Sequence, residues 1–318
     1  MKRVLLFIVT TTFGLLLILG IYFIMPIQTP KNLYIPSKNT DILIDALKQK
    51  GIPLSFLDKL YLQIFQKPQA QGWVYIYKKH LKRYQFLNII SNKNNFYYSF
   101  TIIPGETSYF VLRSLQNKCH FNLKKLQIAY KRVTPFKDGN FLANTYHIPY
   151  YFNETDAIVF LYKNSLKQFK QLLLQHKGSF SLKTLKKYLI VASIIQKEAG
   201  NKNEMKLIAS VIYNRLKKNM RLQMDGTLNY GKYSHTKITP KRIKSDKSFY
   251  NTYKHKGLPK EPVCNVSINA FIAALKPAKT NFYYFTKKDK NSHYFSKDFF
   301  THKKNIQKRK KALKKISF

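Results

Sequence analysis

The feature that most constrains this chain is an uncharged, strongly apolar run near its N-terminus. Residues 4–25 read VLLFIVTTTFGLLLILGIYFIM and contain no charged side chain. A helix of this length is about 33 Å long, which matches the hydrocarbon core of a bilayer. A cleaved secretory signal is the alternative, but its apolar region runs to roughly 7–15 residues, and no small-x-small cleavage site follows here. We therefore expect an uncleaved membrane anchor over residues 1–26.

The flanking charges predict how this anchor is oriented. Lys2 and Arg3 precede the span within a very short tail, and basic residues beside a span favour the cytoplasmic side. Lys31 and later basic residues argue the other way, but long domains translocate largely regardless of their charge. We therefore expect the N-terminus in the cytoplasm and nearly everything after Met25 outside it.

The whole chain is strongly basic. Its 318 residues contain 57 Lys and Arg against 14 Asp and Glu, a formal charge of +43. Such an excess favours a polyanionic partner such as nucleic acid, anionic lipid or a cell-wall polymer. A compositional bias towards Lys, Asn, Ile, Phe and Tyr is the alternative explanation. Because the basic residues form no single tract, and because the chain is expected outside the cytoplasm, we expect no nucleic acid partner.

The sequence gives no metal-binding signal. Cys119 and Cys264 stand far apart with no CxxC pair, and the eight His residues include no HExxH motif. We therefore expect no metal and no cofactor. Whether the two cysteines form a disulfide is left open by the sequence.

A degenerate repeat marks the N-terminal part. IPSKNTDILIDALKQK starts at Ile35 and IPGETSYFVLRSLQNK starts at Ile103. Each copy predicts an extended entry, a Thr or Asn helix cap and an amphipathic helix, and the segments GWVYIY and NNFYYSFTII between them predict strands. Units of this kind suit a glycan-binding module, and a generic α+β spacer is the alternative.

The C-terminal part is predicted to be mostly helical, with loops around a cleft. Helical periodicity predicts helices over residues 156–175, 182–197 and 203–218. The chain then turns to Gly, Tyr, Asn and Pro, which predicts loops that line a cleft. The turn-rich residues 123–155 are predicted to be a linker, and the basic tail over 303–317 a solvated helix.

One of the five Glu residues ends an apolar helical stripe. In VASIIQKEAG, Val191, Ile194 and Ile195 lie seven, four and three residues before Glu198 and so share its helical face. Partial burial and the negative end of the helix dipole both raise the pKa of such a carboxyl group. A carboxyl that keeps its proton near neutral pH suits a general acid. The alternative is a Glu that extends into solvent at a helix end, with Gly200 as the helix stop.

Polar and aromatic side chains that suit sugar binding follow downstream. Asn214 and Arg215 lie beside an apolar helical stripe, and the loops after them supply Gln223, Asp225, Asn229, Tyr230, Asn251 and Tyr253. Their amides, carboxylate and rings are suited to hydrogen bonds with sugars and to stacking on sugar rings. Each of them alone is also an ordinary polar loop residue.

Taken together, these motifs resemble those of the endolytic murein transglycosylase family, also called MltG or YceG-like. The resemblance covers roughly residues 100–305 and rests on ASIIQKEAG, IASVIYNRL, MRLQMDGTLNYG, YNTYKHKGLP, AALKPAKTNFYYF and HYFS. It implies an α+β fold with a single N-terminal transmembrane helix, a LysM-like α/β subdomain over residues 27–135 and a mixed α+β catalytic domain over residues 136–318. It also implies a single-pass protein of the inner (cytoplasmic) membrane.

The resemblance assigns roles to individual residues. Glu198 falls on the family's catalytic Glu. The positions near the cleft that bind substrate are Asn214, Arg215, Gln223, Asp225, Tyr230, Asn251 and Tyr253. This chain departs from the family pattern at Met224 and Gly226 (usually Thr and Pro), at Asn144 (usually Asp) and at Thr301, which replaces the Glu before His302.

The implied reaction is cleavage of the β-1,4 bond between N-acetylmuramic acid and N-acetylglucosamine in peptidoglycan, which leaves an anhydro end. One carboxyl suffices because the nucleophile is the muramoyl sugar's own hydroxyl, so the two carboxylates of most glycosidases are not required. The resemblance further implies work beside peptidoglycan glycosyltransferases, ending nascent strands. The alternatives are a lysozyme-like hydrolase with Asp225 as second carboxylate, and a membrane-tethered peptidoglycan-binding or assembly protein without catalysis.

Overall fold

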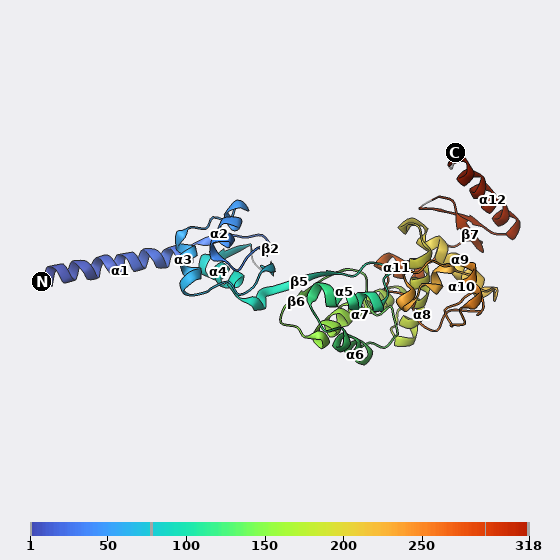
Figure 1. The fold of residues 1–318 in the computed structure, drawn as a ribbon, viewed down its shortest axis with the longest axis horizontal. Coiled ribbons are helices and arrows are strands. Elements are labelled where there is room, and N and C mark those ends of the chain that lie inside the picture. The colour runs from blue at the N-terminus through green and yellow to red at the C-terminus, as the bar shows by residue number, and fades with distance from the viewer. Residues whose placement is uncertain (1, 77–78, 290, 317–318) are drawn as a thin grey trace. The chain divides into compact units, whose positions relative to one another are not determined.

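The structure is a computed structural model that describes residues 2–76, 79–289 and 291–316 (Figure 1). By its contacts the chain divides into two compact units: unit 1 holds residues 1–99 and 147–152, and unit 2 holds residues 100–146 and 153–318. The chain leaves unit 1 within β5 (Phe96–Thr101) and re-enters it within β6 (Thr145–Pro149). Helices and strands are mixed throughout, so the predicted α+β class is confirmed. The predicted division at residues 135 and 136 stays a prediction, since compact units and functional domains need not share boundaries.

The predicted anchor is helical from Lys2 to Ile24. α1 (Lys2–Ile24) is the one helix in the described residues that is long and apolar enough to cross a membrane. At its end the Tyr22 hydroxyl donates to Asp58 Oδ2 at 2.6 Å, and Arg83 Nη1 donates to the same oxygen at 2.8 Å. Because Asp58 and Arg83 are buried, this shared carboxylate joins the last turn of α1 to the rest of unit 1.

Unit 1 is built from short strands and short helices around one apolar core. Its larger sheet has the order β2-β3-β5-β6, with β2 antiparallel to β3 and β3 antiparallel to β5, and a second sheet pairs β1 with β4. Alternation along the strands places Leu33, Ile35 and Val74 in the core. The elements are β1 (Pro26–Gln28), β2 (Asn32–Ile35), α2 (Thr40–Gln49), α3 (Phe56–Ile64), β3 (Gly72–Tyr75), β4 (His80–Lys82), α4 (Arg83–Ser91) and η1 (Lys93–Asn95).

The two copies of the repeat form similar local structure with different caps. Asn39 caps α2 as predicted, because its side chain accepts from the backbone N–H groups of Asp41 and Ile42. Thr107 precedes α5 but makes no side-chain cap, and its hydroxyl donates to the Gly231 carbonyl instead. The first backbone N–H of α5 donates to a distant carboxylate, that of Asp138. The predicted Thr cap is therefore wrong in the second copy.

Unit 2 is mainly helical, and its core lies between α8, α9, α11 and α7. The helices predicted over 156–175, 182–197 and 203–218 are confirmed as α7, α8 and α9. Phe169 and Phe271 meet in this core with ring centroids 4.7 Å apart. The elements are α5 (Ser108–Cys119), α6 (Leu123–Val133), α7 (Glu154–Lys177), α8 (Leu182–Glu198), η2 (Lys202–Glu204), α9 (Met205–Lys217), η3 (Asp225–Leu228), η4 (Gly231–Tyr233), α10 (Pro240–Ser245), α11 (Ile268–Leu275), β7 (Tyr284–Lys287), β8 (His293–Ser296) and α12 (Phe299–Ile316).

The segment predicted as a linker is instead folded structure. Residues 123–155 contain α6, the strand β6 and a loop whose Phe141 and Leu142 are fully buried. A buried loop needs partners for its backbone, and here Phe141 N donates to Asn265 Oδ1 and Leu142 N to Ser165 Oγ. These partners lie far away in sequence, which is why turn composition alone misassigned the segment.

Candidate active site

The apolar stripe of α8 places Glu198 at the last position of the helix. Val191, Ile194 and Ile195 are fully buried, as the helical spacing predicts. The helix already ends before Gly200, which has no positive φ and is no left-handed stop. Glycine is needed there for close approach, because a Cβ on residue 200 would lie 2.5 Å from the Asn291 carbonyl oxygen.

The Glu198 carboxyl group holds its proton more strongly than an ordinary Glu. Burial raises its pKa to about 7, and the charge of neighbouring Asp225 acts in the same direction. Three groups oppose them: the Gly226 backbone N–H, which donates to Oε1 at 2.7 Å, and the charges of Lys287 and Arg215. The contribution of burial is thus as predicted, whereas that of the helix dipole stays a prediction.

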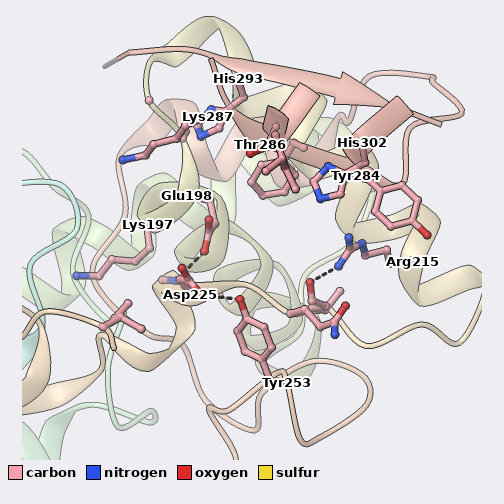
Figure 2. Close-up of a pocket in the computed structure, with 18 of the residues that line it drawn as sticks. Lys197, Glu198, Arg215, Asp225, Tyr253, Tyr284, Thr286, Lys287, His293 and His302 are labelled. Atoms are coloured by element: carbon pink, nitrogen blue, oxygen red, sulfur yellow. Dashed lines mark hydrogen bonds between the residues drawn. The ribbon is translucent and has the colours of Figure 1, made fainter. Parts of the chain in front are cut away.

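Glu198 lines a pocket of about 740 Å³ within unit 2 (Figure 2). Four segments form most of its walls: the end of α8, the loop over residues 222–229, the β7–β8 hairpin and α12. The loop was predicted to line a cleft, and it does. The basic tail was predicted to be a solvated helix, but one part of α12 faces the pocket, since His302, Ile306 and Arg309 line it.

Six of the predicted candidate residues line this pocket: Glu198, Arg215, Gln223, Asp225, Asn229 and Tyr253. The Tyr253 hydroxyl donates to Asp225 Oδ1 at 2.5 Å, which orients that carboxylate beside Glu198. Gln223 has a φ of 48°, a left-handed conformation that is uncommon for a side chain of this size. Backbone strain of this kind concentrates at functional sites.

Arg215 is buried, and its guanidinium group joins two walls of the pocket. Its Nε donates to the Tyr283 carbonyl at 2.6 Å, beside the hairpin, and its Nη1 to the Leu222 carbonyl at 2.6 Å, in the loop. The guanidinium carbon lies 5.2 Å from the centre of the Tyr284 ring. Its donors are therefore largely used within the protein, while its charge still acts on Glu198.

The other three predicted residues lie outside the pocket lining and support its walls. Asn214 Nδ2 donates to the carbonyls of Thr280 and Phe282, just before β7. Asn251 is fully buried and donates to the carbonyls of Ile243 and Asp246. Tyr230 donates to Asp246 Oδ2 and stacks on the Tyr250 ring. Their substrate-binding role stays a prediction.

Sequence reasoning missed the basic and imidazole groups of the pocket: Lys197, Lys287, His293, His302 and Arg309. His293 opens the HYFS motif, so a signal existed, but no chemistry was assigned to it. Within the described part of the chain, no group of three His, Cys, Asp or Glu side chains is placed to hold a metal ion. Cys119 and Cys264 are buried free thiols.

Fold and site together define a mixed α+β protein with one apolar N-terminal helix and a single strongly perturbed acid in a polar pocket. The model of the YceG-like family matches residues 33–308, and the chain belongs to that family. The crystal structure of a yceG-like protein from Listeria monocytogenes shares the fold, with a TM-score of 0.57 and 24% identity over 87% of this chain and 99% of that one.

Two named relatives are similar to half of the chain or less. The endolytic murein transglycosylase of Bacillus subtilis is 36% identical over 156 residues, which are 49% of this chain and 40% of that protein. The endolytic murein transglycosylase of Streptococcus pneumoniae serotype 2 is 30% identical over 129 residues, which are 39% of this chain and 23% of that protein. The matched stretches thus span less than half of each relative.

Proposed function

We propose that this protein is an endolytic lytic transglycosylase of peptidoglycan. One observation carries the proposal: Glu198, whose pKa is raised to about 7, lines a pocket of about 740 Å³ together with polar and aromatic side chains. A general acid works best when its pKa lies near the operating pH. The names of the two relatives agree with this chemistry.

The reaction needs no external nucleophile. Protonated Glu198 gives its proton to the glycosidic oxygen as the bond from the N-acetylmuramic acid C1 breaks. The primary hydroxyl of the same sugar closes on C1, loses its proton and leaves an anhydro end. The Glu198 carboxylate formed in the first transfer can accept that second proton. Lys287 and Arg215 stabilise this carboxylate by their charge.

The proposed setting follows from the anchor. With Lys2 and Arg3 in the cytoplasm, α1 crosses the inner membrane once, and the part of the chain after Met25 lies outside. Peptidoglycan strands are then within reach. The predicted LysM-like role of residues 27–135 and the contact with peptidoglycan glycosyltransferases, which would let the enzyme terminate nascent strands, belong to the same proposal.

A hydrolase is the second candidate, and one observation favours it. Asp225 lies in the same pocket as Glu198 and is oriented by Tyr253, so a second carboxylate is present. Inverting and retaining glycosidases both use such a pair. Asp225 would then activate water, and the product would carry a reducing end.

Product analysis tests the proposal. Purified sacculi are incubated with the detergent-solubilised protein and with Glu198→Gln, and the released glycans are analysed by mass spectrometry. We expect anhydro ends from the wild type and none from the variant, with equal binding of both proteins to sacculi. Reducing ends would establish the hydrolase, and wild-type protein that binds sacculi but releases nothing would establish a non-catalytic binding protein.

A further inference from the structure

A carboxylate and an imidazole form a buried pair in the hairpin wall of the pocket. The His293 backbone N–H donates to Glu204 Oε1 at 2.7 Å, and His293 Nδ1 lies 2.9 Å from Glu204 Oε2. Only 5% of the His293 side chain and 10% of the Glu204 side chain are exposed. Glu204 comes from η2, directly after the helix that carries Glu198, and His293 begins β8. The pair therefore connects two segments that are 89 residues apart.

The geometry sets the hydrogen on one nitrogen of the ring. A carboxylate can only accept, so Nδ1 carries a hydrogen, and the neutral form of the ring has its lone pair on Nε2. No residue in the described part of the chain hydrogen-bonds Nε2, while His293 itself lines the pocket of Glu198. Figure 2 shows His293 and Lys287 on the hairpin side of that pocket. A carboxylate that orients an imidazole and stabilises its protonated form is the arrangement used by Ser-His-Asp hydrolases.

Only one oxygen of Glu198 is hydrogen-bonded within the described part of the chain. Its Oε1 accepts the Gly226 N–H at 2.7 Å, which leaves Oε2. The proposed reaction moves two protons at two different oxygens of the substrate, one to the leaving glycosidic oxygen and one from the attacking primary hydroxyl. A second proton-transfer group allows Oε2 to serve the leaving group alone.

We propose that His293 is the general base of this reaction and that Glu204 is its positioning residue. The inference rests on the proposed function and replaces the Glu198 carboxylate in the second proton transfer. As the C1–glycosidic oxygen bond breaks, that oxygen takes the Glu198 proton. As the C1–O6 bond forms, the hydroxyl proton passes to His293 Nε2. The imidazolium then returns a proton to the Glu198 carboxylate through solvent, so no proton or water is consumed overall.

The alternative role of the pair is to clamp the hairpin. Other contacts already do so: Asn201 Nδ2 donates to the Asn291 carbonyl at 2.7 Å, and residue 200 packs against the same carbonyl. Arg215 and Asn214 hold the chain just before β7. Loss of the imidazole base should therefore leave the pocket wall in place, which makes the two roles separable.

His293→Asn is the matched variant, because its amide nitrogen occupies the position of Nδ1 and can still donate to Glu204. We expect the rate of anhydro-end formation to fall about 100-fold or more, the scale of a lost general base. The melting temperature and the binding of sacculi should stay at wild-type values. In His293→Ala, added imidazole should restore part of the rate, and in Glu198→Gln it should restore none. Glu204→Gln should cost about tenfold in rate, because the imidazolium loses its charged partner.

Two results would overturn the inference. One is a His293→Asn rate within about threefold of the wild type, too small for a general base. The other is a loss of rate in both His293 variants that accompanies a lowered melting temperature and is not restored by imidazole. That result would mean that the pair only holds the hairpin in place. Failure of the proposed function looks different, since wild-type protein would then give reducing ends or no product at all, and both proposals would fall together.

Discussion

Unit 2 contains two carboxyl groups with the same perturbed pKa and different surroundings. Burial raises the pKa of both Glu198 and Asp138 to about 7. Asp138 is sealed in the protein and accepts from Ser108 N, Ser108 Oγ and Gly139 N at 2.8–3.1 Å. Glu198 accepts one backbone hydrogen bond and lines the pocket. A raised pKa therefore marks burial, and only its place in the pocket lining separates Glu198 from Asp138.

The surroundings of the two carboxyl groups differ because each one lies beside a different end of a helix. The Asp138 carboxylate lies beside the start of α5 and accepts a hydrogen bond from the backbone N–H of Ser108, the first residue of that helix. It therefore caps the helix in place of the Thr107 side chain. Glu198 lies at the end of α8, where that helix has no free N–H group to donate to it. Its donor, the backbone N–H of Gly226, comes from η3 across the pocket.

The largest effect on the rate of cleavage should appear when the two carboxyl groups are replaced one at a time. Glu198→Gln should lower cleavage of sacculi by about 10²- to 10⁴-fold, because the proton donor is lost. Asp138→Asn should leave the rate within about threefold, because this carboxyl never meets the substrate. Release of glycan from sacculi by both variants measures this. Equal losses of rate in the two correctly folded variants would show that the pocket does not distinguish Glu198 from Asp138.

A smaller loss of rate should follow when an added methyl group displaces the Glu198 carboxyl group without removing it. A Cβ on residue 226 would lie 2.9 Å from Glu198 Oε1 and 2.6 Å from Lys197 Cβ. Gly226→Ala should therefore displace the carboxyl group and lower the rate by about 10- to 100-fold, as displacements of about 1 Å do in other active sites.

Gly231→Ala is the control for Gly226→Ala. Its added methyl group meets nothing within 4 Å, although a φ of 50° adds backbone strain. We expect a lower melting temperature and an unchanged rate at a temperature where the variant is folded. A wild-type rate for Gly226→Ala would show that the carboxyl position is not critical.

The pH profile should respond to the neighbour of the acid. Glu198 must be protonated in the proposed reaction, so the alkaline limb of the activity profile falls as pH rises through its pKa of about 7. Asp225→Asn keeps an acceptor for Tyr253 but removes the charge that raises this pKa. The alkaline limb should move to lower pH by less than about one unit. Asp246→Asn, outside the pocket lining, should not move it. Loss of all activity in Asp225→Asn would instead favour the hydrolase.

The smallest effect should be on stability and should belong to Asp138. A carboxyl whose folded pKa is raised stabilises the protein fully below its ordinary pKa, about 4, and loses that contribution as pH rises through about 7. Urea unfolding of the solubilised protein between pH 4 and pH 8 should therefore show stability falling with pH. In Asp138→Asn this decline should be shallower. If stability falls with pH equally steeply in the variant and the wild type, Asp138 ionises in the folded protein at little cost in free energy.

The parts that the sequence predicted well are those set by local periodicity. The burial of Val191, Ile194 and Ile195 on the face of Glu198 follows from helical spacing, and the Asn39 cap follows from local hydrogen bonding. The linker and the Thr107 cap were wrong because distant partners decide them. Tyr253 was a candidate by residue type, but its bond to Asp225 crosses 28 residues.

By itself, the sequence determined the apolar N-terminal helix, the main helices of unit 2 and the place of Glu198 at the end of an apolar stripe, because each depends on residues within a few helical turns. The tertiary structure decided what surrounds Glu198: Gly226 as its hydrogen-bond donor, Lys287 as a neighbouring charge, and the Glu204–His293 pair in the hairpin wall of the pocket. These contacts join segments that meet only when the core closes. Their electrostatic effect depends on distance and burial, which no local pattern encodes.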